Sequence, residues 1–185
     1  MSYILKQEFI SEKDAKLLTY YFNSKIKIAP RIDYNNPMFN NRVVYFEEIK
    51  DVYIRDLVEG YVKQIMENLK SHYSIKEPIY PDSINLVKWE TGHELGEHAD
   101  AFFADGRPNY TPYRKYSSIV YLNEDFEGGS FEFTKGTCDE IQPETGLLVA
   151  FTAGLQDMHK VNMVKSGIRY TLACWFTDDP SKSKF

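Results

Sequence analysis

The spacing of apolar residues changes near residue 80, and this change constrains the fold more than any other feature of the sequence. Before it, a stripe of apolar side chains recurs every three or four residues, as on one face of a helix, with Asp51 as the expected N-cap. A shorter helix is predicted after Ser11, which is also suited to an N-cap. The stripe of the longer helix consists of Ile54, Leu57, Val58, Tyr61, Val62, Ile65, Met66 and Leu69.

From Ile84 onward, short strand-like runs are separated by turns that contain glycine or proline. Many short strands with regular turns favour a sandwich or barrel over a parallel α/β sheet. We therefore expect a mainly β (α+β) fold, a single domain over residues 1–185. Two helices in an N-terminal support (about 1–80) should buttress one face of a β core (about 81–178). The expected strands are 42–46, 84–89, 117–123, 130–134, 147–151, 158–161 and 169–176.

The charge balance and the cysteine count exclude several classes of protein. The chain has 22 basic and 27 acidic residues, a net charge of −5, and no basic cluster, so we expect neither a nucleic-acid nor a membrane partner. No apolar run is long enough to span a bilayer, and the apolar stretch at the N-terminus is too short for a secretory signal. Cys138 and Cys174 are too few for a disulfide framework or a cysteine-based metal site. We expect a cytoplasmic protein.

Two of the four histidines do not indicate a metal site. His72 lies at the end of the longer predicted helix, where a cation is ordinarily favourable. The string from His93 to His98 looks at first like a zinc-protease motif. That motif needs two histidines four residues apart on one helical face, whereas these are five apart and Gly96 lies between them. We reject the zinc-protease interpretation.

His98, Asp100 and His159 have the pattern of a different metal site. In an extended segment, residues i and i+2 project to the same side, so the side chains of His98 and Asp100 can meet one ion. A second imidazole from a distant strand, of which His159 is the obvious candidate, would complete a face of two histidines and one carboxylate. Non-haem Fe(II) oxygenases use this face and keep the other coordination positions open. An isolated HxD pair is common by chance, so the residues after His159 matter.

The last predicted strand, 169–176, has two unlike faces. One face is apolar and should pack in a core, and it includes Cys174. The other mixes a cation, small residues and an indole, which suits the lining of a polar cavity: Arg169, Thr171, Ala173 and Trp175. A buried Arg169 would need an anionic partner, which could be the carboxylate of a small-molecule cosubstrate. The alternative is an exposed arginine at the start of a strand.

Several short motifs follow one another between residues 87 and 176. They are Trp89, Gly92, His98-Ala99-Asp100, Tyr121-Leu122-Asn123, Glu127-Gly128-Gly129, the run from Pro143 to Phe151, His159, Arg169 and Trp175. Together they resemble the 2-oxoglutarate/Fe(II) dioxygenases of the prolyl 4-hydroxylase type, and the resemblance covers roughly half of the chain. The chain departs from the family pattern at Leu95, where many members have a tyrosine.

This resemblance implies a double-stranded β-helix (jelly roll) and a definite cofactor set. His98, Asp100 and His159 would be the catalytic metal ligands that hold Fe(II). 2-Oxoglutarate would bind the iron and Arg169, with support from the hydroxyl of Tyr121, and O2 would be the oxidant. The products would be a hydroxylated C–H bond, succinate and CO2, and ascorbate could be a further requirement. For Tyr121, cross-strand aromatic packing is the alternative.

The segment 101–116 should lie over the active-site mouth, as the resemblance implies. It is rich in aromatic residues and proline, which suits an extended prolyl peptide, although an ordinary surface loop has the same composition. Arg114 matches a family arginine, and the candidate substrate residues are Arg114, Trp175, Tyr113 and Phe102. We expect hydroxylation of a prolyl residue in a peptide or protein. The alternatives are the same chemistry on a free amino acid or other small molecule, a nucleic-acid dealkylase, and a non-catalytic jelly-roll binding module.

Overall fold

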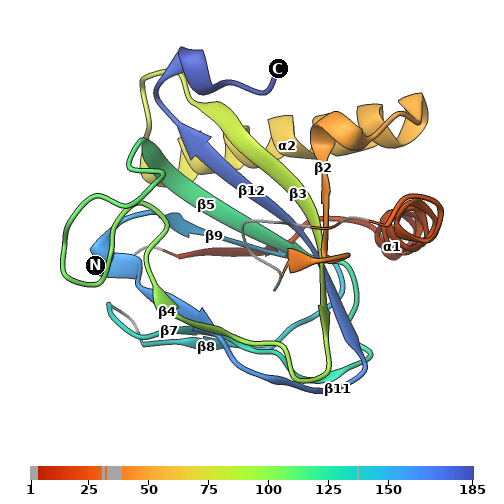
Figure 1. Cartoon of the computed structure of the whole chain (residues 1–185). Helices are drawn as coiled ribbons and strands as arrows, with labels where there is room; N and C mark the ends of the chain where they lie inside the picture. The colour runs from red at the N-terminus through yellow and green to blue at the C-terminus, as the bar shows by residue number, and fades with distance from the viewer. Residues whose placement is uncertain (1–3, 31, 33–38, 137) are drawn as a thin grey trace.

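The computed structural model describes residues 4–30, 32, 39–136 and 138–185 of the chain. Within this part, a major antiparallel sheet of six strands, in the order β1-β9-β5-β12-β3-β2, faces a minor sheet of four, in the order β4-β10-β7-β8 (Figure 1). The major sheet is built from β1 (Leu5–Glu8), β2 (Val43–Tyr45), β3 (Tyr80–Glu90), β5 (Arg114–Tyr121), β9 (Leu147–Thr152) and β12 (Ile168–Thr177). The minor sheet is built from β4 (Leu95–His98), β7 (Phe131–Phe133), β8 (Glu140–Ile141) and β10 (His159–Val161), and β6 (Glu127–Gly128) pairs with β11 (Val164–Ser166).

Both predicted helices are present and cover the outer face of the major sheet (Figure 1). Helix α1 (Glu12–Ile28) begins at Ser11, whose hydroxyl accepts a hydrogen bond from the backbone N–H of Asp14. Helix α2 (Val52–Tyr73) begins at Asp51, whose carboxylate accepts one from the backbone N–H of Ile54. Its predicted apolar stripe packs against the sheet, and its buried members are Ile54, Val58, Val62, Ile65 and Leu69.

The two faces of β12 belong to different parts of the molecule, as predicted. Its outward-facing residues are in the core between the helices and the major sheet, where Cys174 is fully buried. Its inward-facing residues line a cavity between the two sheets. The outward set is Tyr170, Leu172, Cys174 and Phe176, and the inward set is Arg169, Thr171, Ala173 and Trp175.

The facing sheets form the expected jelly roll, but three of their strands, β1, β4 and β8, were not predicted from the sequence. Strand β1 lies at one edge of the major sheet, where Leu5 to Glu8 pair with β9. Together with β2, it shows that the first 80 residues supply strands to the β core as well as helices. Strand β4 lies at the edge of the minor sheet and carries His98 at its end. None of the helices in the described ranges is long and apolar enough to cross a membrane.

Candidate active site

A cavity of about 460 Å³ lies between the two sheets. It is an appropriate size for a small-molecule site. All three predicted metal ligands line it, together with three of the other predicted site residues: Arg114, Arg169 and Trp175. The residues that the sequence spreads over β4, β5, β10 and β12 therefore share one cavity.

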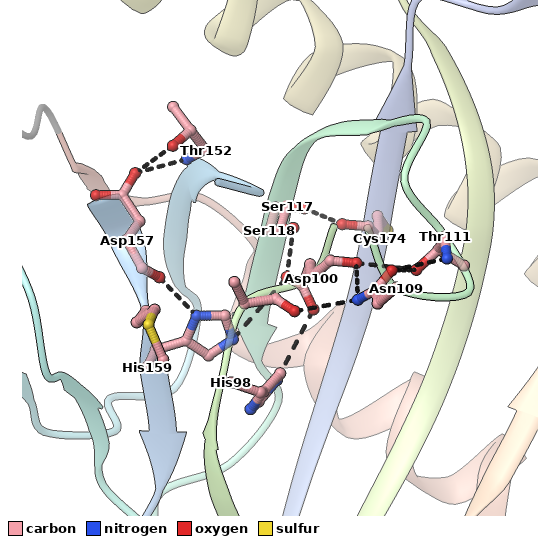
Figure 2. Close-up of polar contacts among 12 residues, drawn as sticks. His98, Asp100, Asn109, Thr111, Ser117, Ser118, Thr152, Asp157, His159 and Cys174 are labelled. Atoms are coloured by element: carbon pink, nitrogen blue, oxygen red, sulfur yellow. Dashed lines mark hydrogen bonds and ion pairs between the residues drawn. The ribbon is translucent and has the colours of Figure 1, made fainter. Parts of the chain in front are cut away.

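The predicted metal ligands converge from neighbouring strands. His98 ends β4 and pairs directly with His159, which begins β10. The carboxylate of Asp100 lies between them, with its oxygens 3.8 Å from Nε2 of His98 and 3.9 Å from Nε2 of His159. One ligand atom from each residue lies within 4.8 Å of the other two. Figure 2 shows the three side chains pointing toward one another.

Backbone carbonyls orient both imidazoles. Nδ1 of His98 donates to the carbonyl oxygen of Gly96, and Nδ1 of His159 donates to that of Asp157, each at 2.8 Å. These bonds place the proton on Nδ1 and leave the lone pair of Nε2 facing Asp100, which is how a histidine is prepared to bind a metal. Burial lowers the pKa of His159 to about 4, so its imidazole is neutral near pH 7.

The turn before His159 is itself fixed. The side chain of Asp157 accepts hydrogen bonds from the backbone N–H of Thr152 at 3.0 Å and from its hydroxyl at 2.6 Å. On the other side, the ring of Phe131 stacks on the imidazole of His159, with 4.7 Å between ring centroids. The position of His159 is thus determined by both its backbone and its ring.

Asp100 is held by residues that the sequence did not single out. The hydroxyl of Ser117 on β5 donates to the carboxylate at 2.6 Å. The side chains of Asn109 and Thr111 both donate to the backbone carbonyl of Asp100, at 3.1 and 2.9 Å (Figure 2). Burial alone would raise the pKa of Asp100, but the positive charge of His159 and His98 in their protonated forms and the hydrogen bond from Ser117 lower it. Serine, asparagine and threonine are too common in such segments to signal this role in a sequence.

Two imidazoles and one carboxylate are a suitable ligand set for Fe(II). All three residues line the cavity, so a metal that they held would lie at its wall. The residues present therefore fit the metal that the sequence led us to expect.

Arg169 and Tyr121 form a candidate site for an anion. Arg169 is 1% exposed, and its Nε and Nη2 have no hydrogen-bond partner among the described residues. The hydroxyl of Tyr121 is equally buried and unpartnered, and its ring centroid lies 5.0 Å from the guanidinium carbon. Burial raises the pKa of that hydroxyl, so it is a neutral donor. An unpaired buried cation is costly, and a carboxylate would satisfy all three donors. The alternative of an exposed Arg169 is wrong.

The predicted substrate residues divide into two groups. Arg114 begins β5 instead of lying in the preceding loop, and its guanidinium lies over the ring of Trp175 at 4.5 Å. Phe102 forms an isolated β-bridge with Pro108, and neither Phe102 nor Tyr113 is among the cavity-lining residues. Contacts of Phe102 and Tyr113 with a substrate stay a prediction.

Comparison with known proteins places these observations in a family. The family model of the 2OG-Fe(II) oxygenase superfamily matches residues 84–177, which is half of the chain. Prolyl 3-hydroxylase 1 of Gallus gallus is 47% identical over 142 residues, covering 66% of this chain and 20% of the relative. The chain spans about a fifth of the length of prolyl 3-hydroxylase 1 from Gallus gallus and from Mus musculus.

Solved structures share the fold at low sequence identity. The viral collagen prolyl hydroxylase of Paramecium bursaria Chlorella virus 1, in complex with 2OG, has a TM-score of 0.71 and 18% identity, with 95% of each chain covered. A prolyl-4-hydroxylase of Pseudomonas putida has a TM-score of 0.72 and 15% identity, with 96% of this chain and 93% of that chain covered. Both likenesses support the jelly-roll fold.

Proposed function

This chain belongs to the 2OG-Fe(II) oxygenase superfamily, and we propose that it hydroxylates a prolyl residue in a peptide or protein, with release of succinate and CO2. The observation that carries this proposal is the placement of the ligand triad His98, Asp100 and His159 in the same cavity as the unpaired guanidinium of Arg169. One set of residues fits Fe(II), and the other fits the carboxylate of a cosubstrate that also binds the metal.

The residues of the chain would bind and orient the reactants. Nε2 of each histidine and the carboxylate of Asp100 would hold Fe(II). Arg169 and Tyr121 would bind the distal carboxylate of 2-oxoglutarate. When bound, the metal and the cosubstrate supply the activation of O2 that C–H hydroxylation requires. Phe131 and Phe151 pack against the ring of His159 and keep this side of the site dry.

The prolyl substrate is supported by the names of the relatives and by the cavity itself. The matched relatives are prolyl 3-hydroxylases, and the fold neighbours are named as a collagen prolyl hydroxylase and a prolyl-4-hydroxylase. The cavity carries an indole and a guanidinium at Trp175 and Arg114, which suit a peptide with proline. Ascorbate as a reductant, the absence of nucleic-acid and membrane partners, and the cytoplasmic location stay predictions.

A product screen tests the proposal. The protein is incubated with Fe(II), 2-oxoglutarate, ascorbate and either proline-centred decapeptides or free amino acids. We expect succinate release together with a peptide that is heavier by one oxygen atom. Hydrolysis of that peptide and comparison with 3- and 4-hydroxyproline standards assigns the carbon. A free small molecule as the only oxidised product would reject the prolyl peptide and leave the iron and cosubstrate roles standing.

An anaerobic titration separates the enzyme from a non-catalytic binding module. Adding 2-oxoglutarate to the Fe(II) protein should produce a weak visible absorption band, because the cosubstrate chelates the metal. The Arg169→Ala variant should need more 2-oxoglutarate to produce it. If wild-type protein gives no band at saturating concentrations, the binding module becomes the better interpretation.

A further inference from the structure

We propose that β3 supplies two specificity residues for the prolyl peptide: Asn85, whose amide N–H groups bind a substrate carbonyl, and Asp82, which positions Arg114 for a second carbonyl. The inference rests on the proposed function, since it names the part of the cavity that recognises the peptide. Strand β3 crosses the major sheet between β12 and β2, and Ser83, Asn85, Val87 and Trp89 line the cavity.

Asp82 holds one end of Arg114. Its carboxylate accepts a hydrogen bond from Nε of Arg114 at 3.0 Å, and its side chain is 2% exposed. Its other oxygen, Oδ1, has no hydrogen-bond partner among the described residues. Burying a carboxylate in this way costs stability, because each lost hydrogen bond to water has to be replaced. Burial indeed raises the pKa of Asp82, against the lowering effect of Arg114. A role in positioning Arg114 explains why the carboxylate is there.

The same contact fixes the direction of the guanidinium. With Nε bound to Asp82 and the plane lying over the indole of Trp175, Arg114 is restrained on two sides. Its terminal nitrogens make no hydrogen bond within the described residues, and the residue lines the cavity. Arg114 is therefore a preorganised donor for an acceptor that enters the cavity.

Asn85 is a second donor on the same wall. It lies in the middle of β3, opposite Ala173 on β12 and Tyr45 on β2. The hydroxyl of Ser83 donates to its Oδ1 at 3.3 Å, which leaves Nδ2 to face a ligand. Nδ2 has no partner among the described residues, and Asn85 is nearly buried at the cavity wall. A bound carbonyl oxygen would satisfy it.

A cavity lining with unpartnered donors, and with no carboxylate besides the metal ligand, matches the chemistry of a prolyl peptide. Proline has no backbone N–H, but every residue of the peptide keeps a carbonyl oxygen. Among the described residues that line the cavity, Asp100 is the only one with a carboxylate, and it belongs to the metal triad. A free amino acid would bring an ammonium group for which the lining has no anionic partner. The wall therefore favours a peptide over a free amino acid.

Three single variants test the inference. Asn85→Ala removes the donor, Asp82→Asn weakens the restraint on Arg114, and Arg114→Ala is the reference for losing the second donor. Asp105→Asn is the matched control, because Asp105 also accepts from the Nε of an arginine, Arg107, at 2.8 Å, but on an exposed surface. The assay is the binding of fluorescein-labelled proline-centred decapeptides, measured by anisotropy with 2-oxoglutarate and redox-silent Mn(II).

We expect Asn85→Ala and Asp82→Asn each to weaken peptide binding by about 10- to 100-fold, as for a lost hydrogen bond to a buried or charged group. Asp105→Asn should bind like the wild type. The affinity for 2-oxoglutarate, measured from the visible band of the anaerobic Fe(II) protein, should stay within about twofold in all variants. Because Asp82 acts through Arg114, the double variant D82N/R114A should bind no more weakly than R114A alone.

The outcomes distinguish the inference from the proposed function. Wild-type affinity in N85A and D82N, with a loss in R114A, would overturn the inference and leave the peptide substrate standing. Additive losses in D82N/R114A would show that Asp82 does not act through Arg114. If wild-type protein binds none of the peptides but still gives the 2-oxoglutarate band, both the inference and the prolyl peptide are rejected.

Discussion

Two hydrogen bonds to backbone carbonyls determine which nitrogen of each histidine faces the metal. Nδ1 of both His98 and His159 is hydrogen-bonded to a carbonyl oxygen, so only Nε2 of each ring is available to bind the metal. We expect His98→Ala, Asp100→Ala and His159→Ala each to abolish succinate release, because a missing ligand loosens the metal. Manganese binding measured by calorimetry should fall in parallel. His72→Ala, on the far helix α2, is the control and should bind manganese normally.

The unpaired guanidinium of Arg169 predicts a separate defect. Arg169→Ala should weaken 2-oxoglutarate binding by about 2–5 kcal/mol, the cost of removing one partner of a desolvated charge pair. Tyr121→Phe should have a smaller effect in the same direction, since it removes one neutral donor. The measurement is the concentration of 2-oxoglutarate that half-saturates the anaerobic Fe(II) protein. Unchanged half-saturation in Arg169→Ala would mean that another residue binds the carboxylate.

The hydrogen bonds that hold the backbone carbonyl of Asp100 give a prediction about metal affinity. Asn109 and Thr111 hold the backbone carbonyl of this ligand, and Asn109 in turn accepts from the backbone N–H of Thr111 at 2.8 Å. We expect the double variant N109A/T111V to bind manganese about 10- to 100-fold more weakly, as for other residues that orient a metal ligand. Thr19→Val removes a comparable hydroxyl on α1 and should bind manganese normally.

At the scale of single residues, the sequence predicted the side chains that follow a recognisable spacing. It missed the side chains that support them, because these follow no spacing. His98, His159 and Arg169 lie in strands, and Asp100 lies in a bend two residues after His98. The spacing of His98 and Asp100 and the alternation along β12 indicated that these side chains could share one cavity. The residues that support them could not be foreseen, because the Asp82–Arg114 contact and the Ser117–Asp100 contact join distant segments of the chain. Only the tertiary fold brings such polar groups together.

The elements themselves show where hydrophobic patterning succeeds and where it fails. The stripe of α2 and the two faces of β12 were foreseen because each buries one complete face. Strand β4 was missed because its residues, Leu-Gly-Glu-His, have little apolar character and its outer edge is unpaired in the sheet. Strand β1 has the same weakness, since its alternation is short and half polar. Edge strands are specified by their neighbours more than by their own sequence.

The two faces of β12 should respond differently to substitution. Leu172→Ala removes a fully buried side chain from the core under the helices, and we expect the free energy of unfolding to fall by about 2–5 kcal/mol. The affinity for 2-oxoglutarate should be unchanged in the folded variant. Urea denaturation measures the first effect. A loss of cosubstrate affinity equal to that of Arg169→Ala would show that the two faces are coupled.

For the whole molecule, ligands that bind only the folded state should raise its stability. With Mn(II) present, 2-oxoglutarate at about 100 times its dissociation constant should stabilise the fold by about 2.7 kcal/mol. For a domain of this size, each kcal/mol corresponds to a rise in Tm of about 2–4 °C. In Arg169→Ala at the same concentration, the rise should fall to about a third or less. It should vanish after the metal is removed with a chelator. An equal rise without metal would contradict binding across the triad and Arg169.

The major sheet also separates the parts of the chain that maintain the fold from those that choose a substrate. Its helix-covered face holds the larger apolar core, while Asn85, Thr171, Ala173 and Trp175 face the cavity from the other side. Changes confined to this inner set leave the outer core untouched, so they can accumulate with little loss of stability. The scaffold is thus evolvable: a combinatorial library at these four positions should yield mostly folded proteins from which new substrate preferences could be selected.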